Sequence, residues 1–233
     1  IDSYDQTIHI TPANLNTMFH RSIEPEFTKM QLQLMFGSIA NIHDPVSNIS
    51  GYGDEGAANH LRVSAQHLKP GFQIFVYGNS AFESHQGVIA RQAQEISQAV
   101  AAQHQLDPDL TLFLKQNNLA IESGSFHNDI VSLATEEVFI FHQEAFADRV
   151  ELERVLHHLK EHVKGFHPIE ILSADISLDD LVSSYLLNSQ LITLENNQMM
   201  MLLPEEVQNH SNCMRWLDEM KSSSPIKRIE SVD

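Results

Sequence analysis

The chain has 233 residues and a mass of 26.4 kDa, and its 42% of apolar residues is enough for a sizeable core. Lys and Arg number 14 against 31 Asp and Glu, so the formal net charge is −17. This charge argues against a general nucleic-acid binder and against docking on an anionic membrane, because both need clustered basic residues. No apolar run reaches the ~20 residues of a membrane-spanning helix.

Cysteine use and the first residues indicate the compartment. The single cysteine, Cys213, cannot form an internal disulfide, which favours a reducing cytoplasm. The opening sequence IDSYDQTIHI lacks the basic and apolar segments of a signal peptide. It also lacks an initiator Met, so we expect the chain to be a fragment of a longer protein.

Strand and helix patterns alternate along the first half of the chain. Residues 7–10 predict a strand, and residues 25–36 predict a helix. The sequence FQIFVY at 72–77 predicts a strand, because strands favour β-branched and aromatic side chains. An Ala- and Gln-rich helix at 88–104 and a further strand at 110–114 follow.

The clearest pattern spans residues 126–176. A short strand at 130–133 and a turn precede VFIFH at 138–142, which is a second strand. Asp148 can cap a helix that runs to about Val163, with its apolar side chains on one face. Gly165 ends this helix, and residues 169–172 form another strand. The segment therefore predicts a β-β-α-β unit.

A similar pattern closes the chain. Residues 199–203 predict a strand, Pro204 starts a helical stretch that ends near Met220, and residues 226–232 predict a closing strand. Strand-helix-strand thus recurs roughly every 60 residues, which indicates an array of repeated modules. No long Gly-, Ser- or Pro-rich linker divides the chain, so we expect a single α/β domain over residues 1–233.

A Gly-rich motif and a histidine motif each suggest a function that the surrounding sequence does not favour. Residues 51–56 fit G-x-G-x-x-G, but the preceding NIHDPVSNIS is a poor buried strand, so a tight turn is favoured over a dinucleotide site. His158, Glu161 and His162 fit H-x-x-E-H, which binds zinc in some hydrolases. Both histidines fall on the shoulder of an amphipathic helix, where a solvated flank explains them without a metal. A zinc metallohydrolase stays open as an alternative function.

Two further features are candidates for chemistry. His127 and Asp129 are two apart, and on an extended chain their side chains point the same way, which suits general acid–base work. Arg21 and Arg91 are isolated cations in an acidic chain, and Arg is the natural bidentate partner of a carboxylate. A hydrogen-bonded histidine and two surface ion pairs are the plainer interpretations. Nothing near Cys213 favours a thiolate.

Several stretches along nearly all of the chain form a specific series, in which GDEGAANH and FHND are the most distinctive. The stretches are ANLNTMFHRSIE (13–24), GDEGAANH (53–60), FVYG (75–78), ARQ (90–92), FHNDIV (126–131), HQEAFA (142–147) and YLLNSQL (185–191). Together and in this order, they resemble the N-succinylarginine dihydrolase family of bacterial arginine catabolism.

The resemblance implies a fold. The family belongs to the guanidine-modifying, or pentein, superfamily, an α/β propeller of five ββαβ modules around a central site. This chain would cover about half of a family member. We therefore expect an incomplete set of two to three modules, lacking the N-terminal and C-terminal parts of the family chain.

The resemblance also implies a site and a reaction. Glu55 and His127 take the places of the family's catalytic Glu and His. His20, Arg21, Arg91 and Asp129 take those of its substrate contacts. The family's nucleophilic Cys has no counterpart here, because Cys213 does not match its surroundings.

The implied reaction converts N2-succinyl-L-arginine to N2-succinyl-L-ornithine, ammonia and carbon dioxide without a metal or organic cofactor. The alternatives to an enzyme acting on this small molecule are the zinc hydrolase and a non-catalytic structural fragment. Exposed strand edges favour association, for which a homodimer is the simplest form.

Overall fold

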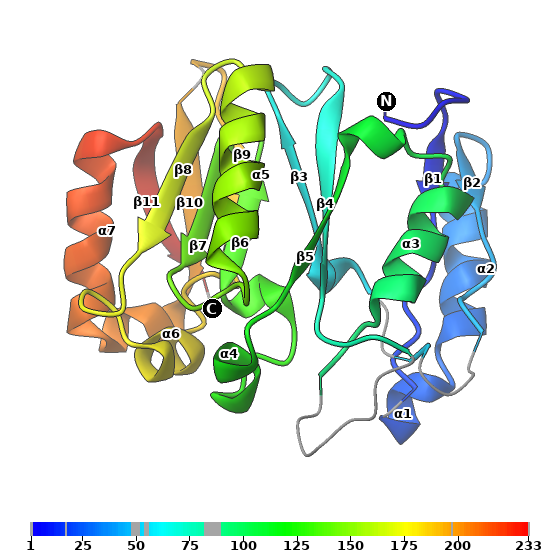
Figure 1. Ribbon diagram of the computed structural model, residues 1–233, viewed down its shortest axis with the longest axis horizontal. Coiled ribbons are helices and arrows are strands. Elements are labelled where there is room, and N and C mark those ends of the chain that lie inside the picture. Colours follow the sequence, from blue (N-terminus) through cyan, green and yellow to red (C-terminus); the bar gives the residue numbers. More distant parts are fainter. Residues whose placement is uncertain are drawn as a thin grey trace.

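Three three-stranded sheets and one two-stranded sheet stand side by side across the molecule (Figure 1). The computed structural model describes residues 2–16, 18–47, 52–53, 56–81, 90–196 and 198–232. Each three-stranded sheet has the same order of elements: two antiparallel strands, a helix, and a third strand parallel to the second. The predicted mixed α/β class and the β-β-α-β repeat are confirmed.

The three repeated units are continuous in sequence. The first unit has β3 (His60–Ser64), β4 (Gly71–Tyr77), α3 (Gln94–Gln103) and β5 (Thr111–Lys115). The second unit has β6 (Ser132–Thr135), β7 (Val138–His142), α5 (Arg149–His162) and β8 (His167–Ile171). The third unit has β9 (Gln190–Thr193), β10 (Met199–Pro204), α7 (Ser211–Ser223) and β11 (Ile226–Val232).

Short helices connect the strands of these units and the units themselves. They include α4 (Asn118–Glu122), α6 (Leu178–Ser184) and the 3₁₀ helices η1 (Ala57–Asn59), η2 (Pro108–Leu110), η3 (Asn128–Ile130) and η4 (Glu205–Asn209). The helical stretch expected from Pro204 is thus two elements, η4 and α7, separated at His210. The helix expected at 88–104 begins at Gln94, where Ala93 is its N-cap; residues 88–89 lie outside the described part.

Helix α5 forms for the reasons that the sequence suggests. The Asp148 carboxylate accepts hydrogen bonds from the backbone N–H groups of Val150 and Glu151, which caps the helix. Its buried side chains, Leu152, Val155 and Leu159, lie on one face. Gly165 follows the helix with φ 85°, a left-handed conformation that glycine adopts without a steric cost.

The core lies between the sheets and the helices that cover them. All five residues of β7 are buried, as are six of the seven in β4. Phe139, Phe141 and Phe146 pack their rings within 5.1–6.1 Å of one another. These strands are buried on both faces, which explains their continuous rather than alternating apolar sequence.

Glu136, in the turn between β6 and β7, joins all three units. Its buried carboxylate accepts hydrogen bonds from the His67 backbone N–H at 2.7 Å and from the Thr193 hydroxyl. Its carbonyl oxygen accepts the Ser64 N–H at 2.9 Å. The first unit supplies Ser64 and the third supplies Thr193, so one residue of the second unit connects both neighbours.

The N-terminal unit is smaller. Strands β1 (Ile8–Ile10) and β2 (Ala40–Ile42) pair in parallel, with α1 (Phe19–Ser22) and α2 (Pro25–Phe36) between them in sequence. The predicted strand at 7–10 and helix at 25–36 are confirmed. Unlike the helices of the three repeated units, α2 has no buried residue.

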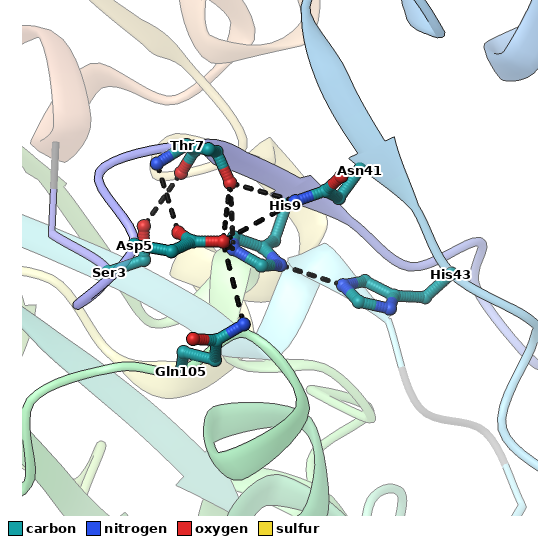
Figure 2. Close-up of polar contacts among 7 residues, drawn as sticks. All are labelled: Ser3, Asp5, Thr7, His9, Asn41, His43 and Gln105. Carbon is teal, nitrogen blue, oxygen red and sulfur yellow. Dashed lines mark hydrogen bonds and ion pairs between the residues drawn. The ribbon is translucent and has the colours of Figure 1, made fainter.

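A network of polar side chains fastens the N-terminal unit to the first repeated unit (Figure 2). His9 on β1 contacts the Asp5 carboxylate through Nε2 at 3.0 Å, and its Nδ1 lies 2.8 Å from Nε2 of His43. His104, which caps the C-terminal end of α3, stacks on both rings with centroids 5.6 and 5.3 Å away. The Gln105 side chain extends the network to Asp5. This cluster could not be predicted from local sequence, because its histidines are far apart in the chain.

Candidate functional site

A cavity of about 580 Å³ opens where the first strands of the three repeated units lie beside one another. Strands β3, β6 and β9 line it, together with the ends of β10 and β11. Its polar lining includes His60, Asp129, Ser132, Asn188, Gln190 and Glu206. Within the described part of the chain it is lined by two carboxylates and by no Lys or Arg, so the cavity favours a cationic group.

Asp129 is the carboxylate that the sequence singled out, and it lies on η3 at this cavity. Its Oδ2 accepts a hydrogen bond of 3.0 Å from Nδ2 of Asn188. Burial raises the pKa of Asp129, while hydrogen bonds from its own backbone N–H and from Asn188 oppose that rise. A half-buried carboxylate of this kind can pair with a guanidinium by charge-assisted hydrogen bonds.

His127 immediately precedes η3. Its backbone is extended, and its carbonyl oxygen accepts the Ser125 hydroxyl at 3.0 Å. The expectation that residues 127–129 are extended and lead into a strand at 130–133 is wrong at its start, because Asn128–Ile130 form a 3₁₀ turn and β6 begins only at Ser132. The alternation argument that placed His127 and Asp129 on one side of a strand therefore does not apply.

The segment after His127 is held by the matched stretch GDEGAANH (53–60). The buried Asn59 side chain accepts the backbone N–H of Asn128 through Oδ1 at 2.9 Å. The Asn128 side chain in turn accepts the Ser132 hydroxyl at 2.8 Å. Asn59 belongs to GDEGAANH, so this motif and FHND meet in the structure although they are distant in sequence.

Glu55, the predicted catalytic carboxylate, lies outside the described residues, as do Gly51 and Asp54. The residues that follow it are described. Gly56 donates its N–H to Oε1 of Gln92 at 3.3 Å, which brings the motif against ARQ. Gly56 precedes a three-residue 3₁₀ helix rather than an α-helix, so the helix that a dinucleotide site requires is missing from this place.

Arg91 lies beside the FHND segment. The carbon at the centre of its guanidinium is 5.9 Å from the centroid of the Phe126 ring. This distance is at the limit of a cation–π contact. Three of the matching stretches, GDEGAANH, ARQ and FHND, therefore surround one region of the molecule.

The sequence model of the succinylarginine dihydrolase family matches residues 1–233. The chain belongs to this family. It is 39% identical over 224 residues to the N-succinylarginine dihydrolase of Erwinia tasmaniensis, covering 94% of this chain and 50% of that protein. It is 38% identical over 243 residues to the N-succinylarginine dihydrolase of Ectopseudomonas mendocina, covering 100% of this chain and 54% of that protein. The chain thus spans about half the length of these relatives.

The fold also has a counterpart among solved structures. The N-terminal domain of ArgZ, an arginine dihydrolase from cyanobacteria solved with bound substrate, aligns with a TM-score of 0.57 at 12% identity. The alignment covers 96% of this chain and 63% of that one. At this identity the likeness shows the fold alone, and it agrees with the pentein-type architecture expected from the family.

His20 and Arg21, two of the substrate contacts that the family implies, lie elsewhere. Both are exposed on α1, and the Arg21 guanidinium donates to the Glu24 carboxylate at 2.7 Å. Neither lines the cavity at Asp129. The start of the same stretch contacts the Gly-rich motif, because the Asn14 side-chain amide donates to the carbonyl of Tyr52, within that motif, at 3.1 Å.

The histidines proposed for zinc have other contacts. His158 and His162 lie on α5 with ring centroids 4.3 Å apart, and Nδ1 of His162 contacts the His158 carbonyl at 2.8 Å. Both rings meet the edge or face of Phe72, whereas Glu161 pairs with His157 at 3.3 Å. No group of three or more His, Cys, Asp or Glu side chains in the described ranges could hold a metal ion. The geometry favours the helix-shoulder interpretation.

Cys213 is buried in α7, where its thiol contacts the Ser184 hydroxyl at 3.6 Å. Burial raises the pKa of this thiol, which disfavours the thiolate that a nucleophile needs. The interpretation of Cys213 as a structural residue is therefore supported. None of the helices in the described ranges is long and apolar enough to cross a membrane.

The sequence analysis did not identify two residues of the site, Asn59 and Asn188. Asn59 holds the backbone after His127, and Asn188 holds the Asp129 carboxylate. Both belong to matched stretches, GDEGAANH and YLLNSQL. Their place in these stretches was the one indication of a role. Asparagine side chains follow no motif spacing that would mark such a role, and the partners of Asn59 and Asn188 are distant in sequence.

Proposed function

We propose that this chain supplies the acid–base and substrate-binding residues of a hydrolase that acts on N2-succinyl-L-arginine. The overall reaction consumes two water molecules and releases N2-succinyl-L-ornithine, two ammonia molecules and carbon dioxide. The observation that carries the proposal is the position of Asp129 at an acidic cavity, on a segment that also contains His127 and that the Asn59 side chain of a family motif holds through the Asn128 backbone. Family membership supports the substrate.

The substrate has one cationic end and two carboxylates, and the chain has matching groups. Asp129, with Glu55, would pair with the guanidinium, each charge-assisted contact contributing about 1.5–3 kcal/mol. Arg91, Arg21 and His20 would bind the carboxylates. The separation of Arg21 from the cavity suits contacts to opposite ends of an extended ligand.

The proposed mechanism uses covalent catalysis. A cysteine thiolate attacks the guanidinium carbon, and His127 protonates the amino group whose C–N bond then breaks to release ammonia. His127 then removes a proton from a water molecule, which attacks the amidino carbon and releases the thiolate and a ureido product. A second cycle on the ureido carbon releases the other ammonia, and hydrolysis of the resulting thiocarbamate gives carbon dioxide and the ornithine amine.

The nucleophile is the part that this chain does not supply. The family's Cys stretch has no counterpart in residues 1–233, and the environment of Cys213 is unsuitable. We therefore propose that the chain alone binds substrate without hydrolysing it. We further propose a cytoplasmic enzyme, a homodimer, without a metal or organic cofactor.

Ammonia release from N2-succinyl-L-arginine tests the function. We expect release by the protein produced from the gene that encodes this chain, and none by residues 1–233 alone. In the active protein, His127→Ala should lower turnover by at least about 100-fold, because general acid–base groups contribute that much. His157→Ala, on the exposed side of α5, is the control. Inhibition by chelators, or near-normal turnover of His127→Ala, would contradict the mechanism.

A further inference from the structure

We infer that Asn188 is a positioning residue, whose amide orients the Asp129 carboxylate and keeps it available to a cationic ligand group. The identity of that group as the guanidinium of N2-succinyl-L-arginine rests on the proposed function. The inference itself concerns the pairing of two residues that come from different parts of the chain, η3 and the turn before β9.

The turn that carries Asn188 is held in place by its neighbours. The Asn188 N–H donates to the Tyr185 carbonyl at 3.0 Å, and Tyr185 adopts the left-handed conformation that ends α6. Leu186 and Leu187 are fully buried between them. The exposed Asn188 side chain therefore extends from a rigid anchor, so its amide reaches Asp129 without ordering a flexible loop.

The contact leaves acceptor sites for a ligand. Nδ2 of Asn188 donates to Oδ2 of Asp129 at 3.0 Å. An ionised carboxylate has about four acceptor sites, so one bond from Asn188 leaves the others for a guanidinium. The amide is uncharged, and it can fix the carboxylate without competing for the cation as Arg or Lys would.

The hydrogen bond from Asn188 affects the protonation of Asp129. Burial raises the pKa of Asp129, and the hydrogen bond from Asn188 favours its ionised form. The other titratable groups that line the cavity are His60 on β3 and Glu206 on η4. Without the amide, Asp129 would take up a proton at a higher pH and lose its attraction for a cation.

The test uses residues 1–233 with Asn188→Ala, Asn188→Gln and the control Asn196→Ala. Asn196 is an exposed asparagine on the β9–β10 turn whose amide donates to Gln198. The carboxyl carbon of Asp129, assigned with Asp129→Asn, is titrated by NMR. Calorimetry at pH 7 and pH 5 measures the binding of methylguanidine and of N2-succinyl-L-arginine.

We expect Asn188→Ala to raise the pKa of Asp129 and to weaken methylguanidine binding by about tenfold at pH 7, the usual effect of losing one hydrogen bond to a charged group. The loss should be larger at pH 5. Asn188→Gln should recover most of the affinity, because it retains the amide donor, and Asn196→Ala should match the parent chain.

The outcomes separate this inference from the proposed function. If Asn188→Ala weakens methylguanidine binding while the parent chain fails to bind N2-succinyl-L-arginine, the substrate assignment falls and the role of Asn188 stands. If the Asp129 titration and methylguanidine binding are both unchanged in Asn188→Ala, the inference is wrong. Failure of the parent chain to bind methylguanidine also overturns it.

Discussion

The three repeated units and the N-terminal unit share a β-α-β arrangement but are stabilised differently. In the second unit, α5 buries Leu152, Val155 and Leu159 against the sheet. In the N-terminal unit, α2 buries no residue, and Phe27 and Leu34 are 57% and 83% exposed. The same arrangement of strands and helix therefore does not guarantee a core.

Polar contacts take the place of apolar packing in the N-terminal unit. The His9, His43 and His104 rings stack, and the Thr11 hydroxyl contacts Nε2 of His104. The Asp5 carboxylate contacts His9 (Figure 2). Lys29 on α2 pairs with Asp44 after β2. Hydrogen bonds and exposed ion pairs contribute less than burial of large side chains. We expect the N-terminal unit to open at a lower free energy than the other three.

Truncation of an aromatic side chain in each region should show the largest difference. Phe139→Ala removes a fully buried ring and should lower the free energy of unfolding by about 3–5 kcal/mol. Phe27→Ala on α2 should change it by less than about 0.5 kcal/mol. Urea denaturation followed by circular dichroism measures both. Equal losses would mean that α2 has a core of its own.

Glu136 should have the next largest effect, since it joins the three packed units and not the N-terminal one. Glu136→Ala removes a buried carboxylate and leaves the His67 N–H and the Thr193 hydroxyl without this acceptor, which should cost about 2 kcal/mol. Glu137→Ala, at the adjacent turn position, is the control. Hydrogen exchange should show the loss in β3, β6 and β9 together. A loss confined to β6 would contradict the connecting role of Glu136.

Acidification should affect the N-terminal unit first. Burial and the neighbouring His43 and His9 lower the pKa of His104 from its usual 6.5 to about 4. Because the unfolded chain then binds the proton more readily, stability is complete above pH 6.5 and falls as the pH drops towards 4. Exchange of the β1 and β2 amides should rise over this range before that of β7. His104→Gln should flatten the dependence, whereas His157→Gln should leave it unchanged.

The helix cap of α5 gives the smallest of these effects. Asp148→Ala removes the acceptor of two backbone N–H groups and should cost about 1 kcal/mol. Glu24 precedes α2 without a side-chain capping bond, so Glu24→Ala should cost less. Thermal unfolding of both variants measures the difference. A larger loss from Glu24→Ala would point to its ion pair with Arg21.

The features that could be predicted from the sequence depend on interactions between residues that are close in the chain. The stripe and cap of α5, the left-handed Gly165 and the buried strand β7 follow from patterns within a few residues of each other. The prediction for residues 127–129 was wrong because the Asn128 backbone, in the 3₁₀ turn, is held by a hydrogen bond to Asn59. Asn59 is distant in sequence, so no local pattern contains this contact. The histidine network and the pair of Asp129 with Asn188 are long-range for the same reason.

The proposed site residues differ in the same way. His127 and Asp129 were proposed because their motif resembles that of a family, and the structure places Asp129 at the cavity. Asn188 could not be assigned a role from sequence, because its function depends on a carboxylate from another part of the chain. Composition indicated an acidic protein, but only the fold shows that acidic groups gather at one cavity.

The continuity of each β-β-α-β unit has a consequence for the order in which the protein folds. Every strand of a unit pairs with strands from the same stretch of chain, so a unit can complete its sheet soon after the ribosome releases it. The contacts of Glu136 reach Thr193 and must wait for the third unit. We therefore expect the units to join late in synthesis, after the individual sheets have formed. The cavity forms at that stage, because all three units line it.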